Sequence, residues 1–208
     1  MKSVLIFGDS LTWGSRPDGG GRHAFEDRWP NVLQAGLGPS VEVIADGLRG
    51  RTTAMDQHAS PANMNGAALL PSALYAHAPL DLVVIALGAN DVYWGYPLQR
   101  ALRGLEHLAE IVTHHPLRVE GAATPKRLFV LPQLLVPCDD PHVTPELIAT
   151  SYKFIELAQK RLGDLGVPVF LTEEVAQSSP LDGIHLDAGN TRALGEALIP
   201  VAAALLDE

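Results

Sequence analysis

Ser3-Val4-Leu5-Ile6-Phe7-Gly8-Asp9-Ser10 begins with a β-forming, mostly apolar run and ends abruptly in the polar turn Gly-Asp-Ser. A short apolar run bounded by turn residues is typical of a buried strand. We therefore expect a strand over residues 3–7, with Ser10 just beyond its carboxyl end. In parallel α/β sheets, ligands bind at the carboxyl ends of the strands. The hydroxyl of Ser10 is thus either a nucleophile or the N-cap of a following helix, and its position alone favours the cap.

Strands and helices alternate along the rest of the chain. Apolar, β-rich runs predict further strands over residues 41–45, 81–87, 127–131 and 167–171. Apolar residues at helical spacing predict helices over residues 28–37, 66–78, 98–112 and 148–162, and a last one from about residue 187 onward. This alternation implies a parallel sheet with helices on both faces. We expect one flavodoxin-like α/β domain over residues 1–208, with three layers and about five parallel strands.

The composition argues against several kinds of partner. A net charge of −9 disfavours binding to nucleic acid or to an anionic membrane, because both require basic patches. No apolar run approaches the roughly 18 residues of a membrane-spanning helix, and the strand pattern begins too early to leave room for a signal peptide. The single cysteine, Cys138, cannot form an internal disulfide, which fits a reducing compartment. We expect a cytoplasmic protein with no membrane or nucleic-acid partner.

Metal and phosphate sites are not expected either. His114 and His115 are adjacent, and adjacent residues on a helix do not face the same way. The run Gly19-Gly20-Gly21 lacks the Lys-Ser/Thr of a phosphate-binding loop and does not follow a strand. We therefore expect no metal and no cofactor. The long loop over residues 12–27 and the proline-rich loop over residues 132–145 are instead candidates for shaping a site.

Three predicted strands end in residues suited to binding a carbonyl oxygen. Ser10 follows the first strand, Gly50 the second and Asn90 the third, and in a doubly wound sheet such ends lie near one another. Attack on a carbonyl needs a nucleophile and hydrogen-bond donors already placed for the oxyanion. Ser10 could supply the hydroxyl and its own N–H group. The N–H of Gly50 and the amide of Asn90 could complete an oxyanion hole.

A serine needs a base to take its proton, and His185 is the candidate. Asp182 lies three residues earlier, and Gly183 between them gives the turn conformational freedom. A carboxylate there would bond the imidazole Nδ1–H, fix its tautomer and favour the imidazolium that forms. The chain order Ser…Asp…His is compatible with a triad, since the triad depends on geometry rather than on order.

These turns resemble the four sequence blocks of the GDSL, or SGNH, serine hydrolases. The matching stretches are Gly8-Asp9-Ser10-Leu11, Gly50-Arg51-Thr52, Gly88-Ala89-Asn90-Asp91 and Asp182-Gly183-Ile184-His185. The resemblance spans nearly the whole chain and implies a single SGNH-hydrolase domain. It implies that Ser10 is the nucleophile, His185 the base and Asp182 its orienting acid. It also implies an oxyanion hole made by the N–H groups of Ser10 and Gly50 and the amide of Asn90.

Further stretches resemble the small aryl esterase and acyltransferase branch of that family, at residues 8–14, 47–53, 65–67 and 79–83. Members of this branch act on small acyl esters, some transfer acyl groups to alcohols or peroxide, and some form closed oligomers. The resemblance therefore implies a homo-oligomeric carboxylic ester hydrolase that acts on short-chain or aryl esters through an acyl-enzyme. The candidate substrate-binding residues are Leu11, Trp13 and Ile184, although Trp13 could equally cover the core.

Several alternatives stay open at this point. A thioesterase or lysophospholipase, or a carbohydrate acetylesterase, would use the same motifs. A non-catalytic flavodoxin-like binding domain would use Ser10 only as a helix cap and would have no use for the pair Asp182-x-x-His185. The Gly-x-Ser-x-Gly motif of α/β-hydrolases is absent, because Thr12 stands where its last glycine should be. Asp9 is expected to bond the backbone of its turn, and Asp91 to cap the following helix.

Overall fold

The computed structural model describes residues 1–207 and contains a five-stranded sheet in which all neighbouring strands are parallel. The strand order is β2-β1-β3-β4-β5. The strands are β1 (Lys2–Gly8), β2 (Val41–Gly47), β3 (Leu82–Ala86), β4 (Lys126–Leu131) and β5 (Val169–Leu171). The chain places β2 on one side of β1 and then β3, β4 and β5 in turn on the other side. In such sheets ligands bind where this direction changes, which here is between β1 and β3. The predicted single-domain α/β fold is confirmed.

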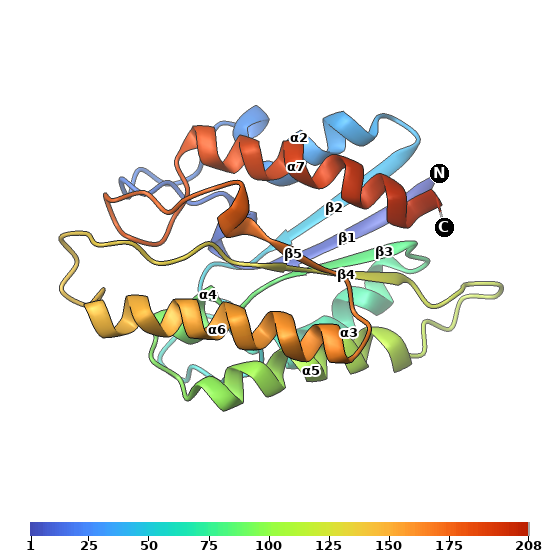
Figure 1. Cartoon of the computed structure of the whole chain (residues 1–208). Coiled ribbons are helices and arrows are strands. Elements are labelled where there is room, and N and C mark those ends of the chain that lie inside the picture. Colours follow the sequence, from blue (N-terminus) through green and yellow to red (C-terminus); the bar gives the residue numbers. More distant parts are fainter. Residues whose placement is uncertain (208) are drawn as a thin grey trace.

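Helices cover both faces of the sheet (Figure 1). The helices α2 (Trp29–Leu37) and α7 (Ala188–Asp207) pack on one face, and α3 (Gly66–His77), α5 (Leu98–His114) and α6 (Pro145–Asp164) pack on the other. Side chains alternate along β1, so that Val4 and Ile6 face α2 and α7 while Leu5 and Phe7 face the other layer. A strand buried on both faces reads as a continuous apolar run, which is why the sequence signal of β1 is so clear.

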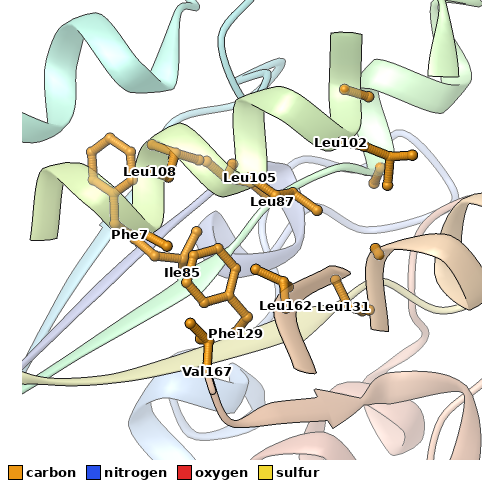
Figure 2. Close-up of a cluster of buried hydrophobic side chains, with 14 of the residues drawn as sticks. Phe7, Ile85, Leu87, Leu102, Leu105, Leu108, Phe129, Leu131, Leu162 and Val167 are labelled. Carbon is orange, nitrogen blue, oxygen red and sulfur yellow. The ribbon is translucent and has the colours of Figure 1, made fainter. Parts of the chain in front are cut away.

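The larger of the two apolar clusters fixes the strands from which the site emerges. Figure 2 shows Phe7, Ile85 and Phe129, which come from three adjacent strands, packed with Leu105 and Leu108 of α5. All five side chains are fully buried, and burying a side chain of this size contributes roughly 1.5–3 kcal/mol. The sheet and α5 thus form a rigid frame that ends at the candidate site.

Ser10 does not cap a helix but begins one. The short helix α1 (Ser10–Trp13) starts directly after β1, and its N-cap is Asp9, whose Oδ1 accepts a hydrogen bond from the Leu11 N–H at 2.9 Å. Asp9, and not Ser10, is therefore the N-cap of this helix, and the Ser10 hydroxyl is free for another partner. The expectation that Asp9 bonds the backbone of its turn is confirmed.

The helix-cap prediction for Asp91 is wrong. Asp91 lies inside the short helix α4 (Ala89–Tyr93). Its buried carboxylate accepts hydrogen bonds from the N–H of Thr53 at 2.9 Å and from the hydroxyl of Thr53 at 2.7 Å. The side chain is therefore engaged with the segment after β2, and it ties α4 to the turn that contains Gly50.

Two further boundaries differ from the sequence prediction. Strand β5 begins at Val169 rather than at residue 167, because the Val167 N–H donates to Leu162 O at 2.9 Å at the end of α6. Pro168 then has no N–H to offer to a strand ladder. The predicted loop over residues 12–27 also contains part of α1 and the short helix η1 (Phe25–Asp27), and η2 (Thr172–Glu174) follows β5.

Candidate active site

A cleft of about 510 Å³ opens at the carboxyl end of the sheet, beyond the ends of β1 and β3. It is lined by all five residues predicted for catalysis and oxyanion binding, which are Ser10, Gly50, Asn90, Asp182 and His185. They come from the start of α1, the turn after β2, the start of α4 and the loop before α7. The fold brings these distant segments together because the carboxyl ends of parallel strands share one edge of the sheet.

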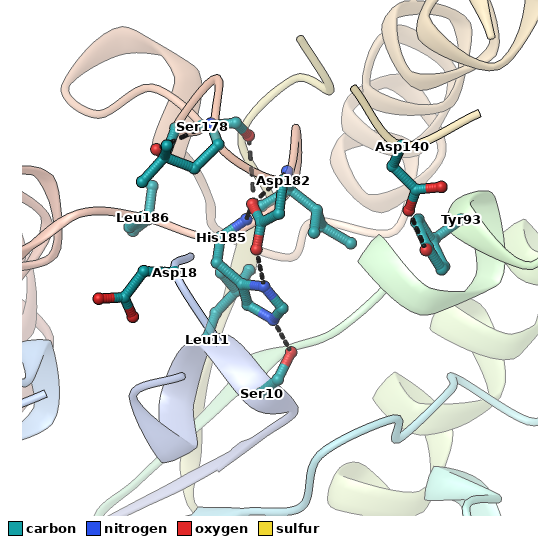
Figure 3. A network of polar contacts seen from close by, with 12 residues as sticks. Ser10, Leu11, Asp18, Tyr93, Asp140, Ser178, Asp182, His185 and Leu186 are labelled. Atoms are coloured by element: carbon teal, nitrogen blue, oxygen red, sulfur yellow. Dashed lines mark hydrogen bonds and ion pairs between the residues drawn. The ribbon is translucent and has the colours of Figure 1, made fainter. Parts of the chain in front are cut away.

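Ser10, His185 and Asp182 form a continuous chain of hydrogen bonds (Figure 3). Ser10 Oγ lies 2.9 Å from His185 Nε2, and His185 Nδ1 lies 2.6 Å from Asp182 Oδ2. A proton on Nδ1 that is donated to the carboxylate leaves Nε2 as the acceptor for the serine proton. The three groups therefore have the geometry of a nucleophile, a base and the acid that orients the base.

Asp182 is stabilised in its ionised form. Its second oxygen, Oδ1, accepts hydrogen bonds from the backbone N–H groups of Ile184 at 3.1 Å and His185 at 2.9 Å. Burial alone raises the pKa of Asp182, but these bonds and the bond from the His185 ring outweigh burial and hold the pKa below its usual range. The carboxylate can therefore stabilise an imidazolium on His185.

The turn over residues 182–185 rests on the proline-rich loop over residues 132–145. Gly183 has a φ of +77°, and a Cβ there would lie 2.7 Å from both Val136 O and Cys138 Sγ. The Val136 N–H in turn donates to Gly183 O at 3.1 Å. Only glycine fits this position, so the proline-rich loop determines where the histidine ring is held.

Three donors are available for an oxyanion. The backbone N–H groups of Ser10 and Gly50 donate to no acceptor among residues 1–207. Gly50 has a φ of +84°, a conformation that favours glycine. The third donor is the amide of Asn90, whose Nδ2 bonds Arg51 O at 3.0 Å and Asp9 Oδ2 at 3.2 Å. Preorganised N–H groups of this kind stabilise negative charge that develops on a carbonyl oxygen.

Arg51 fixes the turn that carries Gly50. Its guanidinium is almost completely buried and donates to Gly8 O at 3.0 Å, to Asp46 O at 2.8 Å and to Asp46 Oδ1 at 2.9 Å. It also lies 3.8 Å from the centre of the Phe7 ring. One side chain therefore joins the ends of β1 and β2 to this turn. Sequence reasoning did not assign this role, although the residue stands in the matched stretch Gly50-Arg51-Thr52.

Two buried carboxyl groups lie behind the candidate donors. Burial raises the pKa of Asp9 to about 6, and the hydrogen bond from Leu11 and the nearby charges of His185 and Arg51 limit the rise. Burial likewise raises the pKa of Asp91 to about 6. Asp9 Oδ2 accepts a hydrogen bond from the amide of Asn90 at 3.2 Å, so this carboxyl group faces the candidate donor.

The three predicted substrate-binding residues are not equally placed. Ile184 lines the cleft beside His185. Leu11 lies outside the cleft lining and packs against both apolar clusters of the core. Trp13 also lies outside the lining, and its ring is in contact with the guanidinium groups of Arg22 and Arg49. The positions of Leu11 and Trp13 therefore do not support direct contact with a substrate.

The structure adds a wall of the cleft that the sequence did not indicate. Tyr93 and Trp94 follow Asn90 on the same short helical segment, and Asp140 comes from the proline-rich loop. The Tyr93 hydroxyl donates to Asp140 Oδ2 at 2.9 Å, and about half of the Trp94 side chain is exposed. The signal in the sequence was the pair of aromatic residues just after the Gly-x-Asn-Asp turn.

The GDSL-like lipase/acylhydrolase family model matches residues 6–190. The chain belongs to this family. The match includes every residue of the candidate triad and of the candidate oxyanion hole. The resemblance that the sequence motifs indicate is thereby confirmed, and the five-stranded parallel sheet is the fold expected for it.

Solved structures of this family are similar over their whole length. A carbohydrate acetylesterase family member from Sinorhizobium meliloti is 42% identical, with a TM-score of 0.94 and 100% of both chains covered. An aryl esterase from M. smegmatis is 35% identical, with a TM-score of 0.90 and 99% of this chain and 100% of that chain covered. These similarities support a carboxylic ester hydrolase.

A curated relative shares part of the sequence. An arylesterase from Vibrio mimicus is 33% identical over 114 residues, which are 53% of this chain and 48% of the relative. The match thus spans about half of the relative's length.

Residues 1–207 contain neither a candidate metal site nor a candidate membrane span. No group of three or more His, Cys, Asp or Glu side chains is arranged to hold a metal ion. In the same residues no helix combines the length and apolar character needed to cross a membrane.

Proposed function

We propose that this GDSL-family protein hydrolyses aryl esters or esters with short acyl chains, through an acyl-enzyme on Ser10. The observation that carries the proposal is the unbroken chain from Ser10 Oγ to His185 Nε2 at 2.9 Å and from His185 Nδ1 to Asp182 at 2.6 Å. A serine that caps a helix in a binding domain would have no reason to contact a histidine held by a carboxylate.

The reaction follows from this geometry. His185 Nε2 takes the Ser10 proton while Oγ forms a bond to the ester carbonyl carbon. The bond from this carbon to the alcohol oxygen then breaks, and the imidazolium gives its proton to the departing alcohol. Water, deprotonated by His185, attacks the acyl-enzyme and releases the acid and free Ser10. Asp182 keeps the imidazole in the required tautomer and balances its positive charge.

The oxyanion receives its hydrogen bonds from Ser10 N–H, Gly50 N–H and the Asn90 amide. The two backbone groups need no reorganisation, because neither has an acceptor among the described residues. Arg51 and Asp9 hold the surroundings of these donors in place. Charge stabilisation of this kind is usually the largest contribution to catalysis of acyl transfer.

The size of the cleft supports small substrates. A cleft of about 510 Å³ lies within the usual range for sites that bind small molecules. The apolar side chains of Tyr93, Trp94 and Ile184 share its walls with glycine, serine, arginine and aspartate residues, whereas a long acyl chain needs an unbroken apolar wall. Transfer of the acyl group to alcohols or peroxide, in place of water, is part of the proposal because the cleft is open to such acceptors.

One observation favours a second substrate within the same reaction. Trp94 lines the cleft and is 51% exposed, and an exposed aromatic face beside hydrogen-bonding groups suits a sugar ring. A relative is described as a carbohydrate acetylesterase family member. An acetylated sugar would be deacetylated by the same triad.

The test compares hydrolysis of p-nitrophenyl acetate and p-nitrophenyl decanoate by the wild type, Ser10→Ala and the control Ser72→Ala, whose serine is exposed on α3. We expect fast acetate hydrolysis that Ser10→Ala loses and Ser72→Ala keeps. A fluorophosphonate probe should label the wild type and the control only. Preference for decanoate would support a thioesterase or lysophospholipase, and equal rates for all three proteins would support a binding domain.

Three broader features belong to the same proposal. The chain over residues 1–208 acts as one domain, it forms a homo-oligomer, and it works in the cytoplasm, where its single cysteine would stay reduced. Sedimentation equilibrium of the purified protein tests the oligomer, and cell fractionation tests the location.

A further inference from the structure

A group of arginines borders the cleft, although the whole chain carries a net charge of −9. Arg16 and Arg49 line the cleft itself, and Arg22 and Arg28 lie on the same side, around the loop after α1. Arg16 is paired with Asp18. Within residues 1–207, the other three have no carboxylate within ion-pair distance. Three arginines without a carboxylate partner thus lie beside the site of an acidic protein.

Arg49 is the member of this group best placed to meet a ligand. Its guanidinium lies 4.7 Å from the centre of the Trp13 ring, and Arg22 lies 5.0 Å from the same ring. Contact with an aromatic face leaves the five N–H donors in the guanidinium plane available. The Arg49 side chain donates to no protein acceptor among residues 1–207, and the next residue is the candidate oxyanion donor Gly50.

The positive charges of Arg22 and Arg28 lie close enough to repel each other, which is unfavourable unless an anion balances them. Burial lowers the pKa of Arg22, and the charge of Arg28 lowers it further. Like charges repel less when an anion lies between or beside them. Arg49 contacts the same Trp13 ring as Arg22, so an anion bound by Arg49 would also reduce this repulsion.

The cleft is also asymmetric in charge. Figure 3 shows Asp18 on one side of Ser10 and His185 and the Tyr93–Asp140 pair on the other side. Arg16 forms an ion pair with Asp18 and therefore lies on the first side. A substrate with one anionic end would therefore bind in one direction, with this end toward the arginines and away from Asp140.

We propose that Arg49, assisted by Arg16, binds an anionic group on the alcohol part of the ester substrate. The planar guanidinium fork matches a carboxylate or a phosphate through two parallel hydrogen bonds. The anion belongs to the alcohol part because the proposed acyl group is small. This inference rests on the proposed ester hydrolysis and narrows its substrates to esters of anionic alcohols or phenols.

The kinetic test uses matched phenyl acetates. The probes are 4-carboxyphenyl acetate, its neutral analogue 4-carbamoylphenyl acetate, and 4-acetoxyphenyl phosphate. Because their leaving groups differ in reactivity, each kcat/KM is divided by the rate constant for hydroxide-catalysed hydrolysis of the same probe. We expect kcat/KM for an anionic probe to exceed that for the neutral amide by about tenfold, mostly through KM, because hydrogen bonds to charged groups are the strong ones. The two anionic probes show whether carboxylate or phosphate is preferred.

The variants assign this preference to one residue. Arg49→Gln should lose most of the preference and Arg49→Lys should retain part of it, while Arg103→Gln, an exposed arginine on α5, should keep it entirely. High salt should reduce the preference of the wild type but not that of Arg49→Gln. Equal kcat/KM for anionic and neutral probes, or a preference that survives Arg49→Gln, would overturn the inference.

A binding measurement separates this inference from the proposed function. Calorimetry with 4-hydroxybenzoate compares Ser10→Ala with Ser10→Ala/Arg49→Gln, neither of which needs activity. Tighter binding to the first protein supports the anion site even if ester hydrolysis fails its own test, and equal binding contradicts it. If Arg49→Gln instead changes the oligomeric state in sedimentation and leaves the preference intact, Arg49 belongs to an interface between copies of the chain, and the inference is wrong.

Discussion

The Asn90 amide donates to Asp9 Oδ2 at 3.2 Å and to Arg51 O at 3.0 Å. Both acceptors are buried behind the cleft, and together they fix the plane of the amide. An oxyanion bound in the cleft must share one of the two amide hydrogens with them. We therefore expect the carboxylate of Asp9 to be a positioning group that acts on the reaction through Asn90 without contacting the substrate.

Asp9→Asn tests this relationship. The new amide can still accept from Leu11 N–H through its oxygen, but its nitrogen then faces the nitrogen of Asn90, and two donors cannot bond each other. We expect kcat for p-nitrophenyl acetate to fall by about 10²-fold with little change in KM. In the Asn90→Ala background the same substitution should have almost no further effect. Additive losses would show that Asp9 acts elsewhere.

Removing the amide itself should be costly. Asn90→Ala should lower kcat by roughly 10²–10³-fold, as the loss of one oxyanion donor does in other hydrolases. Labelling by a fluorophosphonate should persist, because Ser10 and His185 remain in contact. An unchanged kcat would remove Asn90 from the oxyanion hole.

Asp182→Asn should disturb the base while keeping the fold. An asparagine there can present its amide to Nδ1, which favours the tautomer with the proton on Nε2, and this tautomer cannot accept the serine proton. We expect kcat to fall by about 10³–10⁴-fold. The matched control is Asp164→Asn, whose carboxylate forms an exposed pair with Lys160. Comparable losses in both variants would contradict a specific role for Asp182.

Stability should increase as the pH falls from neutral to about 4. Asp9 and Asp91 have folded-state pKa values of about 6 against an ordinary 3.8, so the folded state holds these protons more tightly than the unfolded state. Their contribution is complete below about pH 3.8 and is lost as the pH rises through about 6. Each shift of about two units corresponds to about 3 kcal/mol.

Urea unfolding at pH 7.5, 6 and 4.5 measures this effect. Asp9→Asn should have a shallower dependence on pH than the wild type, because one of the two groups is gone. Asp182 affects stability in the opposite direction. Its pKa is lowered in the folded state, so its contribution to the free energy of unfolding is present at neutral pH and is lost only at more acidic pH. A free energy of unfolding that decreases steadily from pH 7.5 to 4.5 would contradict the assignment to the buried pair.

Two glycines give a matched test of the backbone around the site. Gly50 and Gly183 both have positive φ, +84° and +77°, so alanine is strained at each. At Gly50 the added Cβ meets only Met64 Sδ at 3.7 Å, so Gly50→Ala should cost about 1–2 kcal/mol in the free energy of unfolding. At Gly183 the Cβ also collides with the proline-rich loop, so Gly183→Ala should cost about 2–4 kcal/mol. Equal costs, measured by urea unfolding, would show that the collision is relieved.

The chain's own sequence determined the order of strands and helices, the parallel sheet and the five candidate catalytic and oxyanion-binding residues that line the cleft. The strands could be predicted because burial on both faces makes runs such as residues 3–7 and 81–87 continuously apolar. The meeting of Ser10, Gly50 and Asn90 in one cleft could be predicted because each follows such a run, and parallel strands place their carboxyl ends together.

Only the tertiary structure decided which groups hold these residues in place. The Asn90 amide reaches Asp9, Asp91 reaches Thr53 instead of capping a helix, and Arg51 joins the ends of two strands. Trp13 meets Arg22 and Arg49 rather than the cleft. Patterns of apolar residues along the chain predict helices and strands, because secondary structure depends largely on residues that are close in sequence. The partner of a buried polar side chain depends instead on residues far away in sequence, which meet only after the sheet and its helices have packed.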